Sequence, residues 1–286
     1  MTMTQFNELF PGWRPKVERC SEIITPAQVN RLAATLDEPA LDYGEGDRLP
    51  PLWHWIFAIK PVPHSGLGED GHPRRGGFLP PVTLPRRLFA GMKTDFLHSL
   101  AIGLEAERES EVIDITKKSG ASGDLLFVRL RNSIRQQGNL CVVDEQEIVY
   151  RDKGEPVVLP DVKPFAEPVA NSWTKELIVD AEMLFRFSAV TFNSHRIHYD
   201  RTYAATGEGY PALVVHAPLV AMLLLQLLRK NSEKHIRRFE YRALAPLFDG
   251  QPVRLSAAAE GVDTISMQAQ RSDGEIAARA NCVMFG

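Results

Sequence analysis

The sequence is poor in cysteine and carries no excess of positive charge. Its 286 residues include three cysteines, Cys20, Cys141 and Cys282. Three well-separated cysteines give neither a disulfide framework nor a CxxC metal motif, and they favour a reduced, cytoplasmic setting. Lysine and arginine number 33 against 36 aspartate and glutamate residues, a net charge of −3. Proteins that bind nucleic acid usually carry a basic excess, so we expect no nucleic-acid partner.

The sequence also predicts neither a secretory signal nor a membrane-spanning helix. The first residues, MTMTQFNELFPGW, lack a basic region followed by an apolar run. One stretch, PALVVHAPLVAMLLLQLL (Pro211–Leu228), approaches membrane-spanning length. It contains His216, Pro218 and Gln226, and no second span accompanies it. We therefore interpret it as the buried helix of a globular protein and expect no membrane partner.

A proline-spaced segment separates two halves that resemble each other. DKGEPVVLPDVKPFAEP, residues 152–168, has four prolines and neither a helical nor an alternating period, which predicts an extended linker. Across it, the same letters recur at one constant offset (244 − 97 = 147): Leu97, Leu100 and Gly103 return as Leu244, Leu247 and Gly250. We expect an N-terminal half, residues 1–160, and a C-terminal half, residues 161–286.

Each half is expected to end in three antiparallel strands joined by short turns. The segments EAERESEVIDITKK, DLLFVRLRNSIRQQG and NLCVVDEQEIVY follow Gly103, and QPVRLSAAAEGV, DTISMQAQRS and GEIAARANCVMF follow Gly250. A long apolar helix is expected from about Pro218 to Lys230, whereas the matching stretch of the first half, DGHPRRGGFLPPV, is too rich in glycine and proline for a regular helix. A buried helix wrapped by an antiparallel sheet is the hot-dog arrangement. The expected fold class is α+β, a double hot dog whose first half has lost its helix.

The densest polar cluster occurs in the second half alone. FNSHRIHYD, residues 192–200, gathers His195, Arg196, His198 and Asp200, while the first half has no imidazole at the same offset. One histidine by itself is more often a packed or capping residue than a catalytic one. His195 and His198 form an H-x-x-H pair, but Arg196 would repel a cation and no third ligand has recognisable spacing, so we expect no metal. Asp200 is expected to cap a helix.

The motif and the helix that follows it resemble the MaoC-like hydratase and dehydratase family. The similarity lies in FSAVTFNSHRIHYDRTYA, residues 187–204, and YPALVVHAPLVAMLL, residues 210–224. It implies a double hot-dog hydro-lyase that adds water to, or removes it from, acyl thioesters, with an acyl-CoA as binding partner and no cofactor. The variant TFNSHRIHYD is most similar to the group that hydrates mesaconyl-C4-CoA or itaconyl-CoA to citramalyl-CoA, which points to itaconate degradation.

Two other functions stay open at this point. A hot-dog acyl-CoA thioesterase would need a carboxylate to activate water, and Asn193 stands where the family has its aspartate. A non-catalytic acyl-CoA-binding module would bind without turnover. A homodimer is possible for any of the three.

The resemblance assigns catalytic roles to two residues, and two positions that depart from the family pattern, Asn193 and His195, are further candidates. His198 matches the catalytic histidine, and Ala217 matches the glycine whose backbone N–H forms the oxyanion hole. Pro218 suits a first helical turn, so Ala217 should lie at a helix start, where free N–H groups point outward. Asn193 cannot be a general base but can orient water or the thioester. His195 is the nearest candidate for the second proton carrier, the alternative being water working with His198 alone.

Substrate binding is expected from two further groups. Arg196 replaces the family's proline and could pair with a substrate carboxylate, unless it turns outward to Asp200 or solvent. His216 could contact substrate or simply orient the helix start. The stretch HPRRGGFLPPVTLPRR supplies the remaining candidates, either as a coenzyme A site or as surface charge: Arg74, Arg75, Gly76, Gly77, Phe78, Arg86 and Arg87. GLGEDG, residues 66–71, matches a dinucleotide-binding pattern by letter, but two acids lie inside it and Pro73 follows where a helix should begin.

Overall fold

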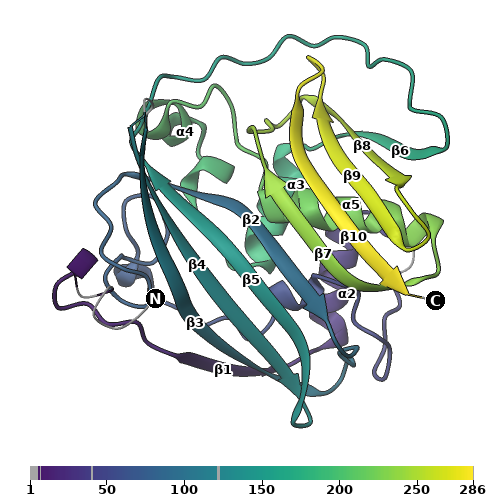
Figure 1. Cartoon of the computed structure of the whole chain (residues 1–286), viewed down its shortest axis with the longest axis horizontal. Helices are drawn as coiled ribbons and strands as arrows, with labels where there is room; N and C mark the ends of the chain where they lie inside the picture. The colour runs from purple at the N-terminus through teal and green to yellow at the C-terminus, as the bar shows by residue number, and fades with distance from the viewer. Residues whose placement is uncertain (1–5, 7, 40, 121–122, 286) are drawn as a thin grey trace.

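The computed structural model describes residue 6 and residues 8–39, 41–120 and 123–285. Its described strands form one ten-stranded antiparallel sheet in the order β1-β3-β4-β5-β2-β7-β10-β9-β8-β6 (Figure 1). The strands of the first half are β1 (Glu18–Ile23), β2 (Arg86–Phe96), β3 (Glu105–Gly120), β4 (Gly123–Gln136) and β5 (Asn139–Arg151). Those of the second half are β6 (Ser172–Ile178), β7 (His235–Ala243), β8 (Pro252–Ala259), β9 (Thr264–Arg271) and β10 (Ile276–Phe285).

The two sets of strands join at a seam between β2 and β7. The register there runs from Gly91 opposite Arg242 to Asp95 opposite Arg238. Arg238 Nε lies 2.6 Å from Asp95 Oδ1 across the seam. The expected offset is kept, because β3 and β8 begin one offset apart (252 − 105 = 147). The three strands predicted at the end of each half are confirmed.

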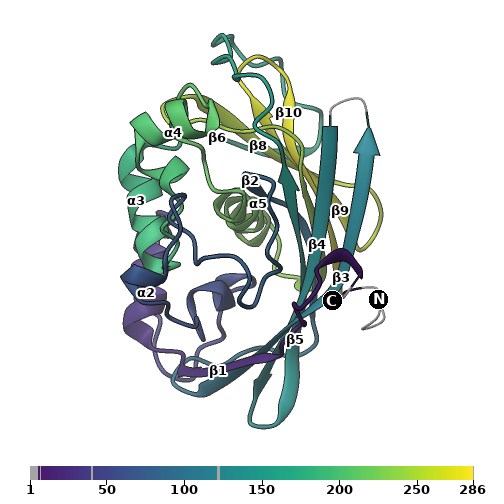
Figure 2. The same ribbon diagram turned by 90° about the vertical axis from the view of Figure 1, so that its left-hand side faces the viewer.

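The helices lie on one side of the sheet. They are α2 (Pro26–Thr35), α3 (Ala181–Val190), α4 (Arg201–Glu208) and α5 (Ala217–Asn231), with 3-10 helices η1 (Trp53–Ile56), η2 (His64–Gly66) and η3 (Arg196–His198). Figure 2 shows α5 almost end-on between the sheet and a layer formed by α2, α3 and α4. Within the described residues, no helix has both the length and the apolar character that crossing a membrane requires.

The predicted apolar helix is α5, and it is buried on every side. Pro218 sets its first turn, and every residue from Leu219 to Leu228 is buried. The one polar group in this run, Gln226, donates from Nε2 to Leu36 O at 2.8 Å and accepts from Lys175 Nζ at 3.1 Å. Because its amide is satisfied, the helix loses nothing by burying it.

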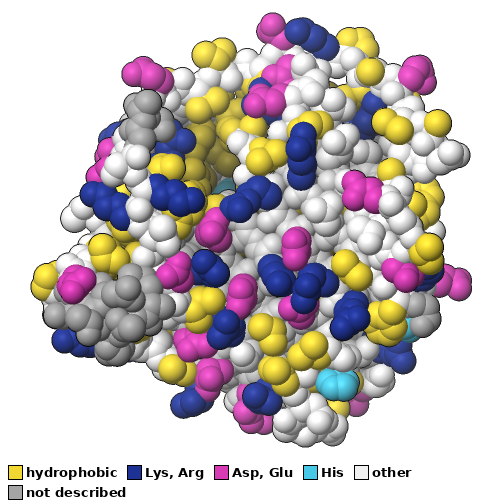
Figure 3. All heavy atoms as spheres, viewed as in Figure 1, with side chains coloured by type: hydrophobic (Ala, Val, Ile, Leu, Met, Phe, Trp, Pro, Cys, Tyr) yellow, Lys and Arg dark blue, Asp and Glu magenta, His cyan; other side chains and the backbone are white. Residues whose placement is uncertain are grey.

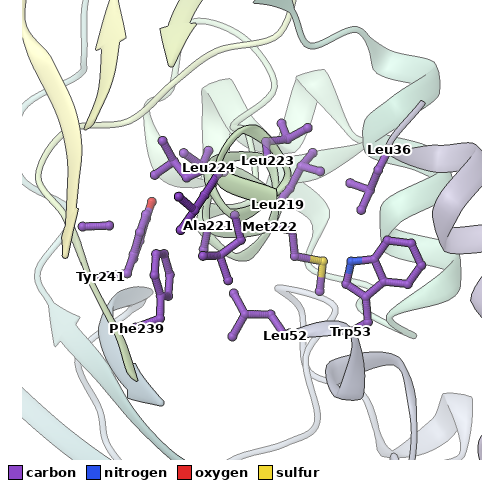
Figure 4. Packing of buried hydrophobic residues seen from close by; sticks show 14 of the residues in the cluster. Leu36, Leu52, Trp53, Leu219, Ala221, Met222, Leu223, Leu224, Phe239 and Tyr241 are labelled. Carbon is purple, nitrogen blue, oxygen red and sulfur yellow. The ribbon is translucent and has the colours of Figure 1, made fainter. Parts of the chain in front are cut away.

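Both halves of the chain pack against α5. In Figure 4, Phe239 and Tyr241 of β7 lie on one side of the helix, and Leu52 and Trp53 of the first half lie on another. All four belong to one core cluster with the α5 residues. Each fully buried leucine of this kind stabilises the fold by about 1.5–3 kcal/mol. The main core is therefore shared between the halves.

The first half has no helix at the position that matches α5. Residues 71–83 are irregular, as the glycine and proline content predicted. The face of β3, β4 and β5 is covered instead by a smaller apolar cluster. Its buried members are Phe6, Trp13, Val82, Val112, Ile115, Leu126, Val128, Leu130 and Tyr150. The linker, residues 152–168, has neither helix nor strand, also as predicted.

Candidate active site

His198 lies buried at the mouth of α5 with one ring nitrogen held by the backbone. Its Nδ1 is 2.7 Å from the carbonyl oxygen of Val214. A carbonyl oxygen only accepts, so Nδ1 carries the hydrogen and Nε2 keeps its lone pair. Val214 is itself fixed, since its N–H donates to Ile197 O at 3.0 Å. The motif loop and the segment before α5 thus hold the ring in one tautomer.

His216 and Ala217 form the start of α5 beside that ring. The His216 ring stacks on His198 with centroids 3.5 Å apart and an angle of 20°. His216 Nε2 lies 2.9 Å from Ser188 Oγ of α3. Ala217 is the first residue of α5, as predicted, and Pro218 has no N–H. The first free N–H groups and the positive end of the helix dipole therefore lie near His198.

His195 is paired with a carboxylate that the sequence analysis did not single out. Its Nε2 lies 2.9 Å from Glu208 Oε1, and both side chains are buried. The second oxygen of Glu208 has no hydrogen-bond partner among the described residues. The backbone N–H of His195 donates to Asn193 Oδ1 at 3.1 Å, so the Asn193 side chain shapes the loop. The His195 ring meets that of His198 edge-on, with centroids 5.4 Å apart.

A loop from the first half completes the cluster with Asp70 and His72. The His72 ring centroid is 4.2 Å from that of His195, and His72 Nδ1 lies 3.2 Å from Asp70 Oδ2. Neither residue was predicted, although Asp70 belongs to GLGEDG, residues 66–71, which was examined for its glycine spacing, and His72 follows directly after it. A histidine and an acid flanking one glycine were the available signal. The sequence contains nothing to show that this loop reaches the other half.

The loop docks backbone to backbone at Gly71. Arg196 N donates to Asp70 O at 2.9 Å, and Ser194 Oγ donates to Gly71 O. Gly71 has a φ of +85°, and a Cβ there would lie 1.9 Å from Ser194 O. Only glycine allows both this conformation and this approach.

Burial keeps three imidazoles of the site, those of His198, His216 and His72, uncharged at neutral pH. Burial, reinforced by the neighbouring His195, lowers the pKa of His198 to about 3. Burial likewise holds the pKa values of His216 and His72 well below the usual range. Desolvation disfavours the charged form of an imidazole, and adjacent rings disfavour it further. A neutral ring with a free lone pair can accept a proton.

His195 and His198 lie side by side, but Asp200 does not join them in a three-ligand group among the described residues. Asp200 caps α4, as predicted, with Oδ1 accepting from Tyr203 N at 2.9 Å. A different trio, Asp70, His72 and His195, has donor atoms within 4.8 Å of one another. The charge of Arg87 acts on His72 and would oppose a cation there. We assign no metal to this trio.

Arg196 adopts the outward alternative described above. Its Nη2 and Nε lie 2.7 and 3.1 Å from Asp200 Oδ2. Its guanidinium also lies 4.2 Å from the centroid of the Tyr203 ring. A substrate carboxylate would have to compete with Asp200 for this group.

Other candidate arginines and the candidate glycines are used by the protein itself. Arg75 donates from Nη1 to Val82 O at 2.8 Å and from Nη2 to Pro85 O at 2.7 Å. Arg86 is buried, and its guanidinium donates to the carbonyl of Glu208. The remaining contacts are Arg74 Nε to Leu67 O, Trp13 Nε1 to Gly77 O, Gly76 N to Leu79 O and Phe78 against the smaller apolar cluster.

The face of the molecule seen in Figure 1 is hollowed near α4. Figure 3 shows this hollow between α4 and the strands near β2, with hydrophobic walls and a histidine side chain at its floor. An apolar entrance that leads to buried imidazoles suits a small acyl group.

Comparison with known proteins identifies related chains. Residues 52–249 match the family model described as hydroxyacyl-thioester dehydratase type 2. The chain is 47% identical to mesaconyl-C(4)-CoA hydratase of Chloroflexus aurantiacus over 275 residues, 96% of this chain and 98% of the relative. It is 27% identical to the mitochondrial hydroxyacyl-thioester dehydratase type 2 of Schizosaccharomyces pombe over 74% of this chain and 79% of that protein.

Solved structures with little sequence identity share the fold. A MaoC-like dehydratase aligns with a TM-score of 0.73 at 14% identity, covering 96% of this chain and 99% of the other. A Mycobacterium tuberculosis protein described as having a double hot-dog fold aligns with a TM-score of 0.62 at 12% identity, over 95% of this chain and 96% of that one. The expected α+β double hot dog is confirmed.

Proposed function

Because this chain belongs to the hydroxyacyl-thioester dehydratase type 2 family and is a hydro-lyase, as its motif indicated, we propose that it hydrates a short, carboxylated enoyl-CoA. The name of its 47% identical relative suggests mesaconyl-C4-CoA as the substrate. The observation that carries the proposal is the position of His198. Its free Nε2 lies at the N-terminus of α5, where a base and the donors for an enolate oxygen are needed together.

His198 is the proposed base for the attacking water. Nε2 accepts a proton from water while the water oxygen bonds to the β-carbon of the enoyl thioester. The π electrons move toward the thioester carbonyl and create an enolate oxygen. The hydrogen bond from Nδ1 to Val214 O keeps the ring oriented during this step. The reverse sequence removes water.

The Ala217 N–H is the proposed donor to the enolate oxygen. It lies at the first residue of α5, where backbone N–H groups have no intrahelical partner. Such a donor typically stabilises a developing oxyanion by about 2.7–4 kcal/mol.

His195 is the proposed donor of the proton that the α-carbon receives. Its ring lies next to His198, and Glu208 is hydrogen-bonded to its Nε2. The carboxylate stabilises the imidazolium that must exist before the proton is given up. In this scheme Asn193 only shapes the loop, through its bond to the His195 N–H.

The substrate class is tested with purified protein and three thioesters. Mesaconyl-C4-CoA, itaconyl-CoA and crotonyl-CoA are followed by enoyl absorbance, product mass and release of free thiol. We expect loss of the double bond with a mass gain of one water and no thiol release. Thiol release without hydration would establish a thioesterase, and binding without either would establish a binding module. A cytoplasmic setting and a homodimer remain part of the proposal.

A further inference from the structure

We propose that Arg87 and Tyr150, both from the first half, bind the free carboxylate of the substrate. This inference rests on the proposed function, because it names the groups that select a carboxylated acyl chain at the same site. It assigns specificity to strands β2 and β5, which carry none of the family motif.

Arg87 and Tyr150 face each other across two paired strands. They are register partners in the antiparallel pair of β2 and β5. Tyr150 is fully buried, no acceptor for its O–H lies within hydrogen-bond geometry among the described residues, and the Arg87 guanidinium is the side chain close enough to donate to its oxygen. Arg75 lies against the Tyr150 ring, 5.0 Å from its centroid, and fixes it. The phenol O–H and the remaining N–H groups of the guanidinium beside it are therefore donors that an incoming acceptor can use.

The pair adjoins the histidine cluster through His72. After burial itself, the charge of Arg87 is the largest influence that lowers the pKa of His72. The His72 ring in turn lies 4.2 Å from that of His195. A substrate whose thioester is at Ala217 could therefore extend its other end past His195 toward Arg87.

The other arginines around the cluster are already occupied. Arg196 is paired with Asp200, Arg75 binds carbonyl oxygens of its own loop, and Arg86 binds the carbonyl of Glu208. Among the described residues, no carboxylate lies within 4.0 Å of the Arg87 guanidinium. Asp70 acts on it electrostatically, but Asp70 is hydrogen-bonded to His72.

A guanidinium in this position calls for an anionic ligand. Removing a charged group from water is unfavourable unless it is paired. Guanidinium binds carboxylate in a two-point geometry, and the Tyr150 hydroxyl can add a third hydrogen bond. Mesaconyl-C4-CoA carries a carboxylate on the carbon that receives the hydroxyl group. Crotonyl-CoA carries a methyl group there and gains nothing from these donors.

The test is the ratio of kcat/KM for mesaconyl-C4-CoA to kcat/KM for crotonyl-CoA. Arg87→Gln should lower this ratio about 10- to 100-fold, with the loss confined to the carboxylated substrate. Arg87→Lys keeps the charge but not the two-point geometry and should give an intermediate ratio. Tyr150→Phe should lower the ratio less than Arg87→Gln does. Arg135→Gln, on an exposed face of β4, is the control and should leave the ratio unchanged.

The outcomes separate the two proposals. A wild-type ratio in folded Arg87→Gln or Arg87→Lys overturns this inference while hydration of both thioesters continues. Loss of the preference in Arg196→Gln, with Arg87→Lys unaffected, also overturns it in favour of Arg196. If wild-type protein hydrates neither thioester, the proposed function itself is wrong.

Discussion

The two halves of the sheet are covered by different kinds of structure. In the second half, α5 covers the sheet with ten consecutive buried residues. In the first half, the matching residues 71–83 are irregular, and a smaller cluster that includes Trp13 and Val82 covers the sheet. The helix supplies ordered N–H donors beside His198. The irregular segment begins with a turn at Gly71 that no helix could make, and that turn places His72 against His195. The half without the helix therefore contributes to the site through the very segment that replaced it.

Exchanging one buried histidine in each half should give the largest contrast. His198→Ala should lower kcat by two to four orders of magnitude, because a general acid–base group is lost. His54→Gln removes a buried histidine of the first half, 4.0 Å from Asp144 and outside the site, and should leave kcat within about twofold. Both variants are compared by steady-state kinetics, with circular dichroism to confirm folding. Near-wild-type turnover in folded His198→Ala would exclude it as the base.

Shortening one buried leucine to alanine in each apolar cluster should show which cluster contributes more to the free energy of unfolding. Leu223→Ala in α5 should cost about 3–5 kcal/mol of unfolding free energy, since Leu223 is 1% exposed and packs within the shared core. Leu130→Ala, in the smaller cluster, should cost about 2–3 kcal/mol, because irregular segments around it can relax into the space. Urea titration measures both. Equal losses would mean that the irregular covering packs as rigidly as the helix.

The two halves should lose stability in different pH windows. The folded pKa of His198 is about 3, below the ordinary 6.5, so the unfolded chain binds more protons below pH 6.5. The contribution of neutral His198 to the free energy of unfolding is complete above pH 6.5. It is smaller by about 2 kcal/mol at pH 5 and continues to fall toward pH 3.

Asp144 of the first half titrates lower. Burial alone would raise the pKa of Asp144, but His54 and the hydrogen bonds from Trp55 and Thr94 keep it below 3.8. The stabilisation that ionised Asp144 gives the folded state is therefore lost only as the pH falls below 3.8. Urea titrations at pH 7, 5 and 3.5 follow both effects, and constant stability from pH 7 to 5 would contradict the assignment of neutral, buried imidazoles.

The smallest expected difference in activity is between two glycine variants that test how the loop carrying Gly71 and His72 packs against Ser194. Gly71→Ala should lower kcat/KM about tenfold, since its Cβ would strike Ser194 O and displace His72. A Cβ added at Gly77 has no atom within 4 Å, so Gly77→Ala is the matched control. Steady-state kinetics on both variants measures the effect. Equal activity of the two variants would mean that the position of this loop does not matter for turnover.

Local patterns in the sequence were enough to predict the fold. The motif before Pro218, the offset of 147 residues and the glycine and proline content of residues 70–82 each reflect nearby backbone requirements. The family, the fold and α5 followed from them, and the comparisons and structure confirm all three. Asp200 was rightly expected as a cap, because capping depends on residues three positions away.

The parts of the site that depend on long-range contact could not be predicted in this way. His72 meets His195 across 123 positions (195 − 72), and no local pattern encodes that contact. Glu208 lies one helix beyond the motif and reaches His195 only because α4 turns back over it. For Arg196, the sequence left two partners open, and the local one, Asp200, is the partner in the structure because it is four residues away.

The shared core has a consequence for what the linker does. Residues 152–168 connect the halves, and Val158 within them is 84% exposed, an open target for a protease. The β2–β7 seam and the residues of both halves around α5 would survive such a cut. The nicked chain should remain a tight complex of two fragments that melts in a single transition, and the fragments produced separately should assemble by complementation. The covalent connection thus serves mainly to keep the concentration of one half high around the other.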